Sequence, residues 1–205
     1  MRNGEASIDP GLTKESAMSL PAYRLLGISG SLRAQAFSKA VLAALAEAMA
    51  SEAEFDHADI GELPHFNQDL YTDPLPPAVE RLRRQIAAAH GLVIASPEYN
   101  HGIPGVLKNA LDWASRPHNG SPLKDKPVLI LTSSPASTGG VRAQYQIRET
   151  LVSALARQVN TPEIVIGHVG AKIVDGRFVD ASTMDFARGG MMAMFKAIAA
   201  QWPKD

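Results

Sequence analysis

Residues 23–45 read YRLLGISGSLRAQAFSKAVLAAL, in which a turn rich in serine and glycine joins a short apolar run to a helical pattern. Leu25 to Ile28 is predicted to be a buried strand, because it is short and bounded by turn formers. After the turn, apolar side chains recur at the spacing of one helical face: Val41, Leu42, Leu45 and Met49. A strand, a turn and a helix in this order predict the opening unit of a parallel sheet.

The same alternation of short and longer apolar patterns continues along the chain. Further buried strands are predicted within Glu54 to Ala58 and at Leu92 to Ala95, Val128 to Thr132 and Ile164 to Val169. Four further helices are predicted from apolar side chains at helical spacing: Val79, Leu82 and Ile86; Val106, Leu107, Ala110 and Leu111; Ile147, Leu151 and Leu155; and Met191, Met194, Phe195, Ile198 and Trp202. Gly189 and Gly190 are expected near the start of the last of these helices. Together they predict an α/β fold, a doubly wound five-stranded parallel sheet with helices on both faces. In such sheets ligands bind at the carboxyl ends of the strands, where the strand order reverses.

Length, charge and cysteine content exclude several classes of protein and of binding partner. With 205 residues and 45% hydrophobic content, one domain is expected over residues 22–205, preceded by a disordered tail at residues 1–21. The net charge of −1 argues against nucleic acid or an acidic membrane surface as a partner. The sequence has no cysteine, so redox chemistry would need a bound cofactor. No apolar run reaches the length of a membrane span, and a cytoplasmic location is expected.

The loop after the first predicted strand has the composition of a phosphate site. Residues 29–38 read SGSLRAQAFS and lead directly into a helix, where hydroxyls, a guanidinium and open N–H groups suit a phosphate monoester. A serine-capped helix start is the competing interpretation. The triphosphate motif GxxxxGK[ST] and the dinucleotide motif GxGxxG are both absent, which favours a mononucleotide.

Two later loops are predicted at the same edge of the sheet. Residues 96–105 read SPEYNHGIPG, in which Tyr99 offers a ring face and Asn100 can meet the polar edge of a heterocycle. Residues 132–140 read TSSPASTGG and open the next helix, whose N–H groups could stabilise negative charge on a ligand. Taken alone, residues 132–140 are more typical of a flexible Ser/Gly connection, but their position directly after a predicted strand favours the ligand site.

The segments GSLR at residues 30–33 and SPEYNHGIPGVLKNALDW at residues 96–113 resemble the NADPH-dependent FMN reductase family, with the closest likeness to bacterial quinone and chromate reductases. The resemblance covers about Arg24 to Asp175. It implies a flavodoxin-like fold, noncovalent FMN, NADPH or NADH as electron donor, and a homodimer or homotetramer. It implies no catalytic side chain and no metal ligand. The residues that it implies for FMN binding are Ser29, Ser31, Arg33, Phe37, Ser38, Pro97, Glu98, Tyr99, Asn100, His101, Ser133, Ser134, Gly139 and Gly140.

Two positions depart from the family pattern, and four residues of the second motif have alternative roles. The family usually has Ser where this chain has Ala36 and Asn where it has Ser38, which alters two phosphate contacts. Glu98 fits either a helix cap or a flavin contact, and His101 either a nicotinamide contact or a surface loop residue. Asp112 and Trp113 are expected in packing or a subunit interface.

The resemblance implies an enzyme that transfers electrons from the nicotinamide through FMN to a quinone, a metal oxyanion such as chromate, an azo dye or a free flavin. One alternative is a flavodoxin-like electron carrier that does not oxidise NADPH, although such carriers are usually more acidic than this chain. A second is a binding module with the same fold and no flavin.

Overall fold

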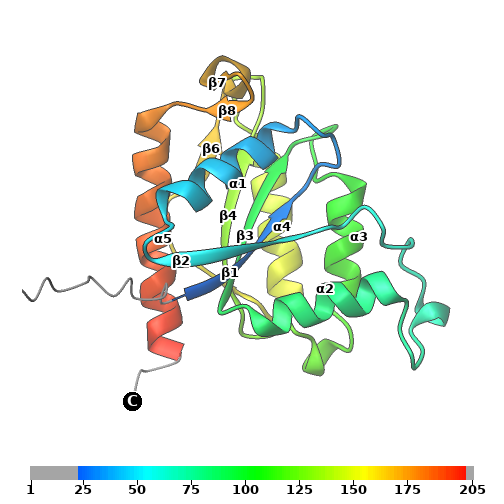
Figure 1. Ribbon diagram of the computed structural model, residues 1–205. Helices are drawn as coiled ribbons and strands as arrows, with labels where there is room; N and C mark the ends of the chain where they lie inside the picture. Colours follow the sequence, from blue (N-terminus) through cyan, green and yellow to red (C-terminus); the bar gives the residue numbers. More distant parts are fainter. Residues whose placement is uncertain (1–22, 202–205) are drawn as a thin grey trace, which may run out of the picture.

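The computed structural model describes residues 23–201, which form a parallel sheet between two layers of helices (Figure 1). The strands lie in the order β2-β1-β3-β4-β5, with β6 also paired to β4. Their bounds are β1 Tyr23–Ser29, β2 Ala53–Ala58, β3 Gly91–Pro97, β4 Pro127–Ser133, β5 Arg157–Gln158 and β6 Ile164–Ile166. The helices are α1 Phe37–Ala48, α2 Pro77–Ala88, α3 Gly105–Ala114, α4 Val141–Ser153 and α5 Ala181–Gln201, with short 3-10 helices η1 Gln68–Leu70, η2 His118–Gly120 and η3 Val169–Lys172.

The central strands are buried on both faces, because their side chains alternate between two apolar clusters. In β3, Leu92 and Ile94 join the cluster formed with α2, α3 and α4, whereas Val93 and Ala95 join the cluster formed with α1 and α5. This division places α1 and α5 on one face of the sheet and the other three helices on the opposite face (Figure 1). The predicted fold class is confirmed.

The fifth strand position is interrupted. The predicted strand Ile164 to Val169 ends at Ile166, because His168 has a left-handed backbone (φ 51°) and η3 follows at once. Two short strands share the position beside β4: β5 pairs with the start of β4, and β6 pairs with the end of β4.

Two helices differ from their predicted extents. Helix α4 ends at Ser153, so Leu155 lies beyond it with a positive φ of 59° and is 37% exposed. Helix α5 begins at Ala181, which puts Gly189 and Gly190 in its middle instead of near its start. Trp202 and the predicted tail at residues 1–21 lie outside the described residues.

A two-stranded antiparallel hairpin, β7 Ile173–Val174 and β8 Arg177–Phe178, was not predicted from the sequence. Its turn is Asp175-Gly176, and both residues have positive φ, 49° and 77°. An Asp-Gly pair between two short strand-forming stretches, here Ile173-Val174 and Arg177-Phe178, is a hairpin signal, so the sequence did contain the information. The hairpin lies beside α1 (Figure 1), with Phe178 buried against that layer.

No helix within residues 23–201 is long and apolar enough to cross a membrane.

Candidate functional site

The carboxyl ends of β1, β3 and β4 lie side by side at one edge of the sheet. Ser29 at the end of β1 is level with Ala95 of β3, and Pro97 at the end of β3 is level with Ser133 of β4. The chain passes from β1 to β2 on one side and then to β3 on the other, so the strand order reverses at β1. The three predicted loops therefore meet at the position where ligands bind in doubly wound sheets.

The loop after β1 is organised by the Ser29 hydroxyl. Its oxygen accepts the Ser31 N–H (3.3 Å) and lies 2.9 Å from the Ser38 hydroxyl at the start of α1. Gly30 permits the loop to pass against β3, because a Cβ there would lie 2.4 Å from the Ser96 Oγ. These contacts hold the loop in a tight curve before α1 begins.

The N-terminus of α1 has no side-chain cap. Its N-cap residue is Ala36, and no side chain in the described part of the chain caps it, so the serine-capped start is wrong. The first N–H groups of a helix have no partner within the helix and carry partial positive charge. Together with the exposed Arg33 in the preceding loop, they form a cradle suited to an anion.

The loop after β3 contains a tight turn at Tyr99–Gly102. The N–H of each of these two residues donates to the carbonyl of the other (2.9 and 3.0 Å), and the central residues Asn100 and His101 have φ of 50° and 67°. The turn leaves the Tyr99 ring 47% exposed. Asn100 and His101 are exposed at the tip.

Helix α4 holds this turn in place. The Glu98 carboxylate accepts the N–H groups of Arg142 (2.9 Å) and Ala143 (3.2 Å) at the first turn of α4. The Gln146 side-chain oxygen accepts the Ile103 N–H at 2.7 Å. Glu98 is thus a helix cap, one of its two predicted roles, and Gln146 is a positioning residue that the sequence did not reveal.

His101 belongs to the same group of contacts. Its side chain is 75% exposed, lies 3.7 Å from the Glu98 carboxylate and touches the Arg142 guanidinium. His101 therefore lies in an exposed loop, and its contact with a nicotinamide stays a prediction.

The loop after β4 is a wall of the same crevice. The Ser134 N–H donates to the Ile166 carbonyl (3.0 Å), and the Ser134 hydroxyl accepts the Ala136 N–H (3.1 Å). Gly139 and Gly140 both have positive φ, 62° and 85°, and a Cβ on Gly139 would lie 2.9 Å from the Ile166 nitrogen. The loop is therefore tied to the end of β6 instead of being a free connection.

A pocket lies between the three loops. Predicted residues that line it are Ser31, Arg33, Phe37, Ser38, Pro97, Glu98, Tyr99 and Ser133, joined by Ala36 and Pro135. Predicted residues that do not line it are Ser29, Asn100, His101, Ser134, Gly139 and Gly140, which shape the loops around it. Within the described residues no group of three or more His, Asp or Glu side chains is arranged to hold a metal ion.

The pocket's polar groups fit a flavin mononucleotide. The Ser133 hydroxyl is buried and has no hydrogen-bond partner within residues 23–201, so it is available to a ligand. The uncapped start of α1 and Arg33 suit the phosphate, and the exposed Tyr99 ring suits a planar heterocycle.

Asp112 and Trp113 lie on α3, away from this pocket. Trp113 is fully buried, donates from Nε1 to the Pro64 carbonyl (2.8 Å) and packs edge-on against Phe66. Asp112 pairs with Lys108 at 2.7 Å. Trp113 therefore serves packing, and Asp112 serves local charge pairing on α3.

The strand order and the cradle after β1 define a flavodoxin-like protein. A family model for NADPH-dependent FMN reductase matches residues 23–171. An NAD(P)H-dependent FMN reductase of Pseudomonas aeruginosa is 41% identical over 172 residues, which cover 83% of this chain and 92% of that protein. A 2-hydroxy-1,4-benzoquinone reductase of Burkholderia is 37% identical over 185 residues, 90% of this chain and 98% of that one.

Among solved structures, the flavoenzyme NAD(P)H:(acceptor) oxidoreductase FerB of Paracoccus denitrificans superposes with a TM-score of 0.78 at 32% identity, covering 87% of this chain and 98% of its own. The chain belongs to the NADPH-dependent FMN reductase family. The family resemblance, the oxidoreductase class and the pairing of FMN with NAD(P)H that the sequence predicted are confirmed.

Proposed function

We propose that this chain binds FMN noncovalently in the pocket between its three loops and passes electrons from NADPH or NADH to a quinone-like acceptor. The observation that carries the proposal is the convergence of an uncapped helix N-terminus, the unpartnered Ser133 hydroxyl and the exposed Tyr99 ring in one crevice. The names of two relatives, an FMN reductase and a benzoquinone reductase, support the donor and acceptor classes.

Each loop has a separate task in this proposal. The start of α1 with Ser31, Arg33 and Ser38 holds the phosphate, Pro97 to Tyr99 form the platform for the ring, and Ser133 donates a hydrogen bond to a polar ring atom. Bound FMN supplies the redox chemistry, taking a hydride from the nicotinamide and returning electrons to the acceptor. The protein contributes orientation and fixed dipoles, and no side chain is assigned as an acid or base.

An absorption spectrum tests the proposal. Purified protein mixed with FMN and freed of excess cofactor is expected to be yellow, to bleach on anaerobic addition of NADPH, and to regain colour with benzoquinone. Chromate, an azo dye and free FMN as alternative acceptors then rank the acceptor classes. A protein that retains no FMN would contradict the proposal, and one that is reduced only by dithionite would support the electron-carrier alternative.

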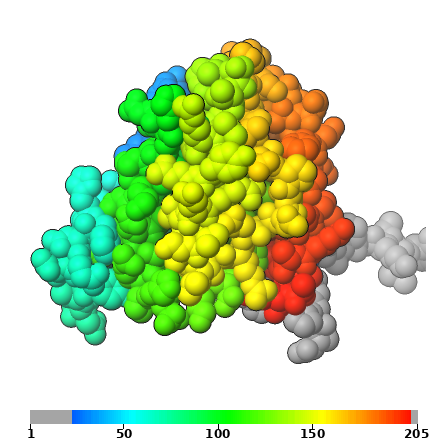
Figure 2. Space-filling model, turned by 180° about the vertical axis from the view of Figure 1, so that it is seen from behind, coloured from blue at the N-terminus to red at the C-terminus, as the bar shows by residue number. Residues whose placement is uncertain are grey.

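We also propose a homodimer or homotetramer in the cytoplasm. Helix α4 lies across the surface between α3 and α5 (Figure 2), and it carries Tyr145 and Val152 with exposures of 55% and 64%. Exposed large apolar side chains on one helix are typical of an interface. Light scattering coupled to size exclusion measures the assembly, and a monomeric mass at micromolar concentration would contradict this part.

A further inference from the structure

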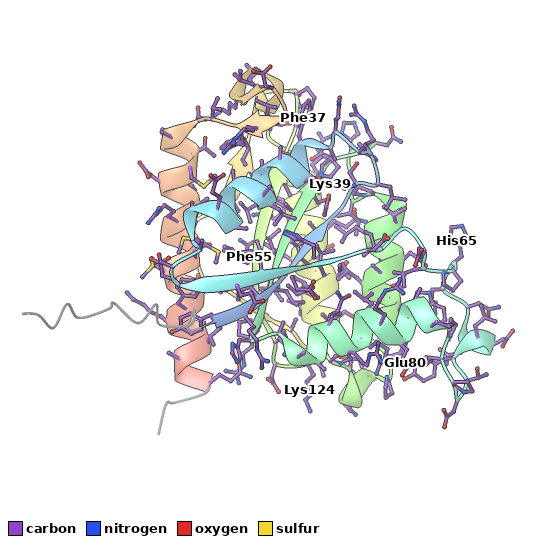
Figure 3. The ribbon with its side chains drawn as sticks, in the orientation of Figure 1. Phe37, Lys39, Phe55, His65, Glu80 and Lys124 are labelled. Atoms are coloured by element: carbon purple, nitrogen blue, oxygen red, sulfur yellow. The ribbon has the colours of Figure 1, made fainter. Side chains whose placement is uncertain are left out.

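A second hollow adjoins the proposed FMN pocket. It has a volume of about 610 Å³, compared with about 90 Å³ for the pocket between the loops, and it lies between the start of α1 and the turn of the β7–β8 hairpin. Arg33, Ala36 and Phe37 line both spaces, so the two are neighbours. Figure 3 labels Phe37 and Lys39 on α1, below that hairpin.

The lining of this hollow suits a nucleoside phosphate. It has two cations, Arg33 and Lys39, and one anion, Asp175. Arg33 and Lys39 are both exposed and form no ion pair within residues 23–201. Ile173 and Ala40 add apolar surface of the kind on which a base can lie.

The wall opposite α1 is held in place. Phe178 of β8 is buried in the cluster shared with α1 and α5, and the Arg177 guanidinium pairs with Glu47 of α1 at 3.0 Å. The hairpin begins at Ile173, just beyond the 23–171 segment that the family model matches. The α1 wall of the hollow thus lies within that segment, and the hairpin wall lies just beyond it.

We propose that this hollow holds the adenosine-phosphate half of the nicotinamide donor, with Lys39 against its phosphates and with Arg33, which lines both spaces, shared with the FMN phosphate. The inference rests on the proposed function, because the nicotinamide half must reach the flavin pocket next to it. A pyrophosphate joins the two halves of a dinucleotide, so the two halves need neighbouring sites, and this cationic hollow adjoins the flavin pocket. The Asp175 carboxylate repels a phosphate. Removal of Lys39 from one wall is therefore expected to weaken binding of the donor, and removal of the Asp175 charge from the other wall to strengthen it.

Three substitutions test this assignment. Lys39→Ala removes one cation from an exposed helix position where alanine is well tolerated. Lys124→Ala is the matched control, since Lys124 is also exposed and lies at the opposite end of the molecule (Figure 3). Asp175→Asn removes the anion and keeps a residue type that tolerates the left-handed turn.

We expect Lys39→Ala to raise the KM for NADPH by about fivefold to tenfold with kcat and FMN occupancy unchanged, as for the loss of one charge-assisted hydrogen bond. Asp175→Asn is expected to lower that KM, and Lys124→Ala to leave it unchanged. Calorimetric titration with adenosine 2′,5′-bisphosphate gives a second readout that needs no bound FMN, and its Kd is expected to follow the same order.

Equal values for Lys39→Ala and Lys124→Ala in both measurements would overturn the inference. If the protein takes up FMN and is reduced by NADPH while Lys39→Ala has no effect, this inference alone fails. If the protein binds no FMN, the proposed function fails, and the bisphosphate titration still decides the anion site.

Discussion

At the scale of single residues, Glu98 connects two walls of the candidate pocket. It lies within the ring platform, Pro97 to Tyr99, and its carboxylate accepts N–H groups at the start of α4. Its side chain is only 13% exposed, so the charge is held within the fold by these hydrogen bonds.

Substitution of Glu98 is therefore expected to affect both stability and FMN binding. Glu98→Ala removes the cap, and we expect a loss of about 1 kcal/mol, or roughly 2–4 °C in Tm for a domain of this size. The FMN dissociation constant is expected to rise, while Glu98→Gln, which retains an acceptor oxygen, gives a smaller change. Thermal unfolding and FMN fluorescence quenching measure the two effects.

The control for this substitution is Glu80→Ala on the exposed surface of α2, far from the pocket (Figure 3). If Glu98→Ala matched that control in both Tm and FMN affinity, the connecting role of Glu98 would be excluded.

At the scale of elements, helix α5 contains two adjacent glycines in different environments. A Cβ on Gly189 would meet no atom within 4 Å, whereas a Cβ on Gly190 would lie 2.8 Å from the Ile164 Cδ1 and 3.2 Å from the Leu129 Cδ1. Gly190 thus allows α5 to pack closely on the sheet. Gly189 has no such packing requirement.

Alanine at these two positions is expected to change the free energy of unfolding in opposite directions. Gly189→Ala is expected to stabilise the protein by about 0.5–1 kcal/mol, because alanine loses less backbone entropy in a helix. Gly190→Ala is expected to lower stability, because overpacking costs about 1–3 kcal/mol and exceeds that gain. Urea unfolding of the two variants provides the measurement, and the reverse order of midpoints would disprove the packing argument.

The start of α5 carries a pH-dependent cap. The Thr183 N–H donates to the Asp180 carboxylate at 2.7 Å, and Lys172 lies 3.2 Å from it. Hydrogen bonds from the Thr183 hydroxyl and N–H, with a smaller effect of Lys172, lower the pKa of Asp180. A lowered pKa in the folded state stabilises the protein above the unfolded value, about 3.9, and this contribution is lost as the pH falls through the folded value.

Asp180→Asn is expected to have a lower Tm than wild type at pH 7, because a neutral amide accepts the Thr183 hydrogen bonds more weakly than a carboxylate and cannot pair with Lys172. The difference is expected to shrink as the pH falls below about 4. Asp185→Asn, at an exposed position on the same helix, is the control. A Tm difference for Asp180→Asn that stays constant between pH 7 and pH 3 would rule out the ionised cap.

At the scale of the whole molecule, the candidate pocket joins loops from three neighbouring strands. A ligand that contacts all three loops binds the folded sheet and not the unfolded chain, so it stabilises the domain as a unit. FMN at 100 times its Kd is expected to add about 2.7 kcal/mol. Riboflavin at the same concentration lacks the phosphate for the α1 cradle and is expected to add less.

Thermal unfolding with each flavin measures this difference. Equal Tm shifts for riboflavin and FMN would contradict phosphate binding at α1. The Lys39→Ala variant is the control: it leaves the α1 N–H groups intact, so it is expected to keep the difference between the two flavins.

The sequence by itself determined the order of the elements and the three loops of the site. Alternating side chains such as Leu92 and Val93, and helical repeats such as Leu82 and Ile86, are local patterns, and each is set by the geometry of one element. Since carboxyl ends of neighbouring parallel strands share an edge, the loops after β1, β3 and β4 were predictable as one site.

Only the tertiary structure decided which side chains line the pocket and which support it. Glu98 and Gln146 reach their partners across sequence separations of 44 and 43 residues, and the hollow at Lys39 exists because the hairpin at Asp175 folds back on α1. The break in the fifth strand likewise depends on pairing with β4. Such contacts have no local signature, because their energy comes from groups that are brought together only when the whole sheet has formed.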